Sequence, residues 1–254
     1  MAEIKWNKLG ECFFETDNVD TNFTLVANTM SEAFGLTLDS EKSTTKYYKL
    51  GSVSNGGVAF VKYNETAKIE YLYYKKEDGT MSVIHSMGGT GNISLRKNYG
   101  ARCYDVNIGG YHIYMLKHVV NGVNSNHAGA FSVESFTDYF SGQTCKVLFG
   151  DGARSGDNFG LLGTGYVYEK SADMYVRLDQ VVIGGTNYPI EAKGITVATP
   201  VFFQNAYHYG YLGRSPNLYA IYPSIATHLK LGTQYQVNGK TFSYIGYQLF
   251  VRSD

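Results

Sequence analysis

The sequence is poor in several residue types, and their scarcity narrows the class of protein. Its 254 residues include three cysteines, four prolines and one tryptophan. An odd number of widely spaced cysteines does not form a disulfide framework, so we expect buried free thiols. No stretch approaches the roughly 18 apolar residues that span a bilayer, and residues 1–10 lack the basic and apolar runs of a signal peptide. We therefore expect synthesis in a reducing cytoplasm and no membrane insertion.

Charge is also sparse and balanced. Lysine and arginine number 22, aspartate and glutamate number 22, and charged residues make up 17% of the chain. Proteins that bind nucleic acid normally carry a basic excess, so the composition argues against such a partner. A net charge of zero also removes the electrostatic repulsion between copies, which favours a homo-oligomer.

Motifs that carry chemistry are missing. The sequence contains neither the H-E-x-x-H nor the paired C-x-x-C pattern of zinc sites, and no G-x-S-x-G nucleophile motif. The glycine-rich residues 150–165 lack the Gly-Lys-Ser/Thr ending of a phosphate-binding loop. His112 and His118 share a strand face but lie ~20 Å apart, too far to hold one metal ion. We predict a non-enzyme without metal or cofactor.

Aromatic residues and glycine are abundant, with 23 tyrosines, 14 phenylalanines and 29 glycines. Tyrosine favours strands, and glycine supplies the positive φ angles of tight turns. Residues 21–36 are the exception, because Phe23, Val26, Met30 and Phe34 recur at helical spacing before Gly35. We predict a mostly β, antiparallel β-sandwich-like body with one N-terminal α-helix, with an α+β fold as the alternative. Residues 133–140 could form a second short helix.

Several alternating segments are joined by turn residues and predict hairpins. They comprise residues 67–74 with 81–85, 101–108 with 111–120, and 234–237 with 240–252, the last pair around Asn238-Gly239. Residues 173–183 alternate as one strand. The segment 240–252 is apolar on both faces, so it is either covered on both sides or paired with another subunit. Its interface candidates are Phe242, Tyr244, Tyr247 and Phe250, and Gly246 suggests a bulge.

The four prolines lie together between Pro189 and Pro223. This shift in composition suggests a β-rich domain over residues 1–188 and a C-terminal hairpin region over 189–254, unless both belong to one domain. An aromatic segment within the second region is the best candidate contact patch, because aromatic rings stack on sugars or partner side chains and arginine adds a planar donor fork. The patch comprises Tyr207, His208, Tyr209, Tyr211 and Arg214.

Two stretches carry a family resemblance. Residues 216–254 contain a Leu-Tyr-Ala-Ile-Tyr-Pro strand end, an Asn-Gly hairpin and an aromatic final strand, and residues 6–38 join a short strand to a helix and a Phe-Gly-Leu-Thr-Leu turn. Both resemble the ends of virion structural proteins from tailed bacteriophages. The resemblance implies a component of the tail, baseplate, neck or fibre apparatus, with other virion structural proteins as partners and the virion as its location.

These observations lead to one expected function and two alternatives. We expect a non-enzymatic structural component of a phage virion that acts in multiple copies through subunit docking. The first alternative is a carbohydrate- or receptor-binding module for host attachment, with a host surface glycan as its partner. The second is a β-fold glycan hydrolase, whose two carboxylates would converge only in space.

Overall fold

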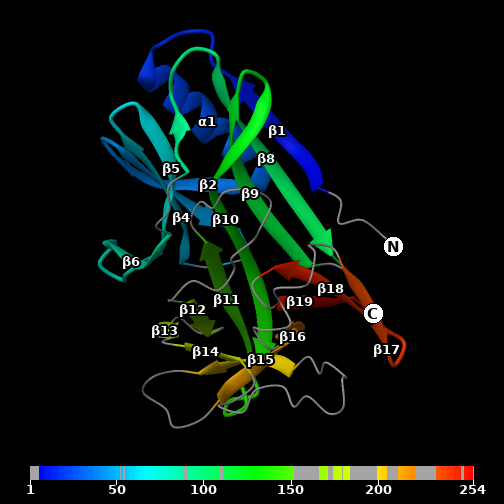
Figure 1. Ribbon diagram of the computed structural model, residues 1–254. Helices are drawn as coiled ribbons and strands as arrows, with labels where there is room; N and C mark the ends of the chain where they lie inside the picture. The colour runs from blue at the N-terminus through cyan, green and yellow to red at the C-terminus, as the bar shows by residue number, and fades with distance from the viewer. Residues whose placement is uncertain are drawn as a thin grey trace.

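The computed structural model describes residues 6–51, 53, 55–87, 91–108, 111–151, 166–170, 174–178, 180–183, 199–204, 211–220, 233–246 and 249–253. These residues form three antiparallel sheets and one α-helix (Figure 1). The expected fold class, a mostly β, sandwich-like body with an N-terminal helix, is confirmed. No helix in the described part of the chain has the length and apolar character needed to cross a bilayer.

The helix α1 (Val19–Phe34) forms where the apolar stripe predicts it. Asn18 caps its start by accepting a 3.0 Å hydrogen bond from the backbone N–H of Thr21. Gly35 ends it in the left-handed conformation, at φ 62°. Phe23, Val26 and Met30 are buried on the inner face, so the stripe faces the core.

The first sheet has seven strands in the order β1-β8-β9-β10-β11-β12-β13. Their bounds are β1 (Trp6–Phe13), β8 (Tyr99–Ile108), β9 (Tyr111–Val120), β10 (Val123–Thr137), β11 (Thr144–Asp151), β12 (Tyr166–Lys170) and β13 (Met174–Leu178). The predicted pairing of 101–108 with 111–120 is confirmed as the β8–β9 ladder. The glycine-rich residues 152–165 and the turn residues 109–110 lie outside the described residues.

The second sheet has the order β2-β3-β4-β5-β6, and a short strand β7 also pairs with β5. The bounds are β2 (Leu36–Lys42), β3 (Thr45–Leu50), β4 (Gly56–Tyr63), β5 (Thr66–Lys75), β6 (Met81–Ser86) and β7 (Ile93–Ser94). The predicted hairpin around Asp78-Gly79 is confirmed, with Gly79 at φ 79°. The main core joins side chains from α1 and from these first two sheets, including Met30, Phe60, Ile69 and Phe131.

The third sheet has six strands in the order β14-β15-β16-β19-β18-β17. The bounds are β14 (Gln180–Ile183), β15 (Thr199–Gln204), β16 (Tyr211–Ala220), β17 (Gln234–Val237), β18 (Lys240–Gly246) and β19 (Leu249–Ser253). The Asn238-Gly239 hairpin is confirmed, with φ angles of 51° and 76° that suit a type I′ turn. The boundary predicted near residue 188 falls between β14 and β15, which pair within this one sheet.

Three predictions about single elements are wrong. Residues 240–252 do not form one strand: β18 and β19 pair with each other, and Tyr244 lies opposite Phe250. The apparent two-sided strand is therefore a hairpin, and the register shift between Tyr244 and Gly246 is the expected bulge. The segment 173–183 was predicted as one strand, but its described residues form two strands, β13 and β14, which belong to different sheets. Residues 133–140 are not helical, because β10 continues to Thr137 and pairs with β11.

The long strand β10 joins the two ends of the molecule. It runs from the half that contains α1 toward β15 and β16 (Figure 1), and it contacts both β5 and β16. Gly213 permits the second contact, because a Cβ atom there would lie 2.3 Å from Cδ2 of Phe136 and 2.6 Å from the carbonyl oxygen of Thr137. The close approach of β10 and β16 builds the site described next.

Candidate functional site

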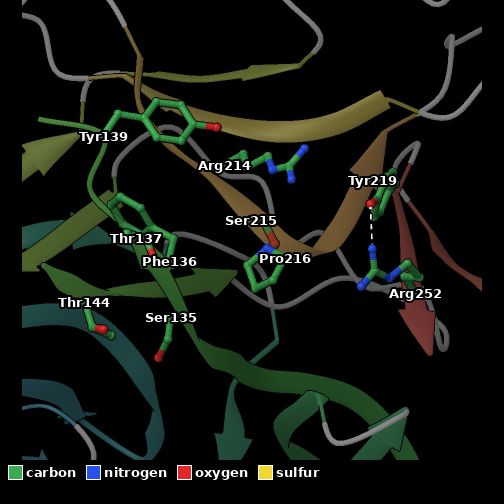
Figure 2. Close-up of a pocket in the computed structure, with 10 residues that line it drawn as sticks. All are labelled: Ser135, Phe136, Thr137, Tyr139, Thr144, Arg214, Ser215, Pro216, Tyr219 and Arg252. Atoms are coloured by element: carbon green, nitrogen blue, oxygen red, sulfur yellow. Dashed lines mark hydrogen bonds between the residues drawn. The ribbon is translucent and has the colours of Figure 1, made fainter. Parts of the chain in front are cut away.

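A hollow of about 460 Å³ lies where the end of β10 and the start of β11 meet β16 and β19. Figure 2 shows the side chains that line it. They are Ser135, Phe136, Thr137, Tyr139, Thr144, Arg214, Ser215, Pro216, Tyr219 and Arg252. The described part of the lining combines two arginines, two tyrosines and four hydroxyl-bearing serines and threonines, with no aspartate or glutamate among them.

The two arginines differ in their surroundings. Nη1 of Arg252 donates a 3.1 Å hydrogen bond to the hydroxyl of Tyr219, and its guanidinium lies 5.9 Å from the centre of the same ring (Figure 2). Arg214 is exposed, and it forms no hydrogen bond or ion pair with any residue that the structure describes. In Figure 2 its guanidinium extends between the side chains of Tyr139 and Tyr219. Arg252 is therefore held in place, whereas Arg214 keeps its donors for a ligand.

A tight turn after β10 forms one rim of the hollow. The buried carboxylate of Asp138 accepts hydrogen bonds from the backbone N–H groups of Phe140, at 2.8 Å, and Ser141, at 3.4 Å. The backbone of Asp138 adds bonds to Gln143 and Gly142. The turn so fixed presents Tyr139 and Phe140, whose residues are 55% and 70% exposed. We call residues 138–143 the aromatic turn.

Behind the hollow lies a buried carboxyl group. Glu134 is 2% exposed, and its Oε1 accepts a 3.1 Å hydrogen bond from Nδ2 of Asn217. Burial raises the pKa of Glu134 to about 7, against the opposing effect of the Ser215 and Asn217 side chains. This carboxyl is consequently mostly neutral below pH 7 and about half ionised at pH 7, so it carries less negative charge behind the hollow than an ordinary glutamate.

The predicted contact patch is described only in part. Tyr207, His208 and Tyr209 lie outside the described residues. Tyr211 begins β16. Arg214 lines the hollow, so the structure places this predicted arginine beside an aromatic turn and a tyrosine that the sequence did not single out.

Two of the four predicted interface residues are buried within the protein. Tyr244 and Phe250 are 6% and 4% exposed, and their ring centres are 5.3 Å apart. Phe242 is half-buried and meets the Tyr219 ring edge-on at 5.1 Å. Tyr247 lies outside the described residues. Of the three described side chains, Phe242 alone keeps appreciable exposed area for a partner.

An Asp–His pair lies on the strands β8 and β9. Nδ1 of His112 is 2.9 Å from a carboxylate oxygen of Asp105, and its Nε2 is 3.2 Å from Nδ2 of Asn107. Both ring nitrogens are thereby engaged. His118 lies on the same strand but is half-buried against the Tyr99 ring, and burial lowers its pKa. No group of three or more histidine, cysteine or acidic side chains suited to a metal ion occurs among the described residues.

A second hollow, of about 290 Å³, lies near the start of α1. Its charged side chains include two ion pairs within the chain, Lys62 with Asp20 and Lys46 with Glu41. Because these lysines already have carboxylate partners, the hollow beside the aromatic turn is the stronger candidate site.

Comparison with known proteins adds no relative. No family model matches the chain, and neither a curated protein nor a solved structure matches it. The functional argument therefore depends on the residues described above.

Proposed function

We propose that the protein is a non-enzymatic structural component of a phage virion tail, baseplate or neck, which acts in multiple copies through subunit docking. The virion assignment rests on the resemblance of residues 6–38 and 216–254 to tailed-phage structural proteins. The docking role is supported chiefly by one observation, the exposure of Tyr139 and Phe140 on the fixed aromatic turn.

The aromatic turn has the properties of a docking anchor. Tyrosine, phenylalanine and arginine are enriched in protein interfaces, and a few such side chains supply most of the binding energy. Asp138 already holds the turn in one conformation, so little conformational entropy is lost when a partner covers it. Arg214 beside the turn adds a donor fork to the same surface.

A sheet edge offers a second place for subunits to meet. Strand β17 is the last strand of the third sheet in the described structure, and Tyr235 on it is 43% exposed. An edge strand presents backbone donors and acceptors that can pair with a strand of another chain. We assign the aromatic turn the main contact and this edge a supporting one.

Light scattering after size-exclusion chromatography, at two protein concentrations, tests the proposal. We expect a defined oligomer whose mass falls when Tyr139 and Phe140 are both replaced by serine. Val123→Ser is the matched control, because Val123 is an apolar residue that is 68% exposed on the β9–β10 hairpin. A monomeric parent at both concentrations, or equal loss in the control, would contradict docking through the aromatic turn.

The hollow favours a second function, binding of a saccharide. Its volume of about 460 Å³ lies within the ~300–1,000 Å³ range of small-molecule sites. Tyr139 and Tyr219 offer ring surfaces, and Ser135, Thr137 and Thr144 offer hydroxyl groups. A receptor-binding role in host attachment would use these groups directly. The test is saturable binding of a sugar that is lost when the hollow is altered.

A further inference from the structure

We infer that the hollow between β10, β16 and β19 binds a carboxylated sugar residue of the uronic acid class, and that the guanidinium of Arg214 contacts its carboxylate. The inference rests on the second proposed function, saccharide binding, and narrows it to acidic sugars. It depends on the charge of the lining, the availability of one arginine, and the shape and polarity of the surrounding wall.

The charge of the lining selects an anion. Arg214 and Arg252 both line the hollow, and none of the lining residues that the structure describes is acidic. Among the residues that the structure describes, the acidic residues nearest to the lining along the chain are Asp138 and Glu134, and both are buried. Asp138 is engaged by the backbone of the aromatic turn. Glu134 accepts a hydrogen bond from Asn217, and burial raises its pKa to about 7. An exposed carboxylate from the ligand would therefore meet the positive charge of Arg214, with Arg252 nearby in the same lining.

Arg214 is the side chain placed to bind that carboxylate. It is exposed and has no hydrogen-bond or ion-pair partner among the described residues. A guanidinium presents parallel N–H donors that match the two oxygens of a carboxylate. Arg252 donates a 3.1 Å hydrogen bond to the Tyr219 hydroxyl, which orients its guanidinium. Its side chain would therefore lose little conformational entropy when a ligand binds.

The remaining lining favours a sugar over an acidic peptide. Ser135, Thr137 and Thr144 supply hydroxyl groups that both donate and accept, as the hydroxyls of a pyranose ring require. Tyr139, which is 55% exposed, supplies a ring face for the C–H surface of a sugar, whereas the Tyr219 ring already contacts Arg252 and Phe242. An acidic peptide would share only the carboxylate, so it serves as a separate arm of the test.

Isothermal titration calorimetry of the full chain distinguishes these ligands. The probes are a galacturonate disaccharide, the methyl ester of the same disaccharide, which lacks the charge, and an acetylated Gly-Glu-Gly amide. We expect the free acid to bind at least about tenfold more tightly than the ester, and added salt to weaken only the acid. Arg214→Gln should lose at least about tenfold in affinity for the acid, and Arg214→Lys should lose less.

Arg96→Gln is the control, since Arg96 is an exposed arginine that pairs with Glu65 outside the hollow. An unchanged thermal unfolding midpoint in Arg214→Gln shows that the variant is folded. Equal binding of acid and ester would overturn the inference and leave saccharide binding standing. No binding of either sugar would overturn both. Tighter binding of the peptide than of the acid would assign the hollow to a protein segment instead.

Discussion

Nδ2 of Asn217 donates a 3.1 Å hydrogen bond to Oε1 of Glu134, and this bond joins β16 of the third sheet to β10 of the first sheet. Both residues lie beside the candidate site, since Ser135 and Pro216, their neighbours in the chain, line the hollow. Glu134 is 2% exposed. A carboxyl group at such a junction makes the contact between the sheets sensitive to its own ionisation.

Glu134→Gln should alter how stability depends on pH. The pKa of Glu134 is raised from an ordinary 4.5 to about 7 in the folded protein, chiefly by burial. The folded state therefore binds more protons between these values, so the contribution of this group to stability is fully present below pH 4.5, falls as pH rises through 7, and is constant at higher pH. The loss attributable to this group is roughly 3 kcal/mol. Glutamine keeps the acceptor for Asn217 without a charge, so the variant should lack this decline.

Urea unfolding at several pH values from 5 to 8 measures the effect. Glu41→Gln is the control, because Glu41 is an exposed carboxyl that pairs with Lys46; it should keep the slope of the parent. Parallel pH profiles for the parent and Glu134→Gln would show that Glu134 is not the responsible group.

Gly213→Ala should loosen the junction between β10 and β16. The added Cβ would lie 2.3 Å from a ring carbon of Phe136 and 2.6 Å from the backbone oxygen of Thr137. Overpacking of this kind costs about 1–3 kcal/mol. Gly51→Ala is the control, since nothing lies within 4 Å of its Cβ position. Thermal unfolding compares the two variants. Equal midpoints would mean that the contact between β10 and β16 accommodates the added methyl group without a loss of stability.

Local signals in the sequence predicted much of the fold. The end of the helix at Gly35 and the hairpin turn at Asn238-Gly239 could be predicted because glycine and asparagine adopt positive φ angles more readily than other residues.

The segment 133–140 was wrongly predicted as a helix because Val133, Phe136 and Phe140 have helical spacing. Its strand form depends on pairing with β9 and β11, which periodicity does not reveal. The break between β18 and β19 was missed because a hairpin of aromatic strands has the same pattern as one strand apolar on both faces.

The candidate site was predictable only at Arg214. Tyr219 shares β16 with Arg214, but Arg252 reaches the site through the pairing of β19 with β16, and Tyr139 reaches it through the close approach of β10 to β16. The turn residues Asp138 and Gly142 did carry a local signal, because aspartate and glycine favour turns. That signal was outweighed by the apparent helical spacing around it.

The cysteines Cys12 and Cys103 should be unreactive in the folded protein. Both are buried on the neighbouring strands β1 and β8, and burial raises the pKa of each thiol. The thiolate is the reactive form, so alkylation at pH 8 should be slow until the protein unfolds. Peptide mapping after brief iodoacetamide treatment, with and without urea, measures each site. Rapid modification of either thiol without urea would mean that the core under α1 opens readily.

The carboxylate of Asp138 should determine how well the aromatic turn docks. Asp138→Ala removes the acceptor for the N–H groups of Phe140 and Ser141, while Tyr139 and Phe140 themselves remain. We expect a loss of about 1–2 kcal/mol in stability from the unpaired donors. We also expect weaker self-association, because the turn must then be ordered on binding.

Asp138→Asn keeps a side-chain oxygen at the same place and should retain most of both properties. Sedimentation of the two variants and the parent at matched concentrations gives the association, and urea unfolding gives the stability. If Asp138→Ala associates as tightly as the parent despite its lower stability, then a fixed turn is not what the partner subunit recognises, because the same exposed rings would dock equally well from a loosened backbone.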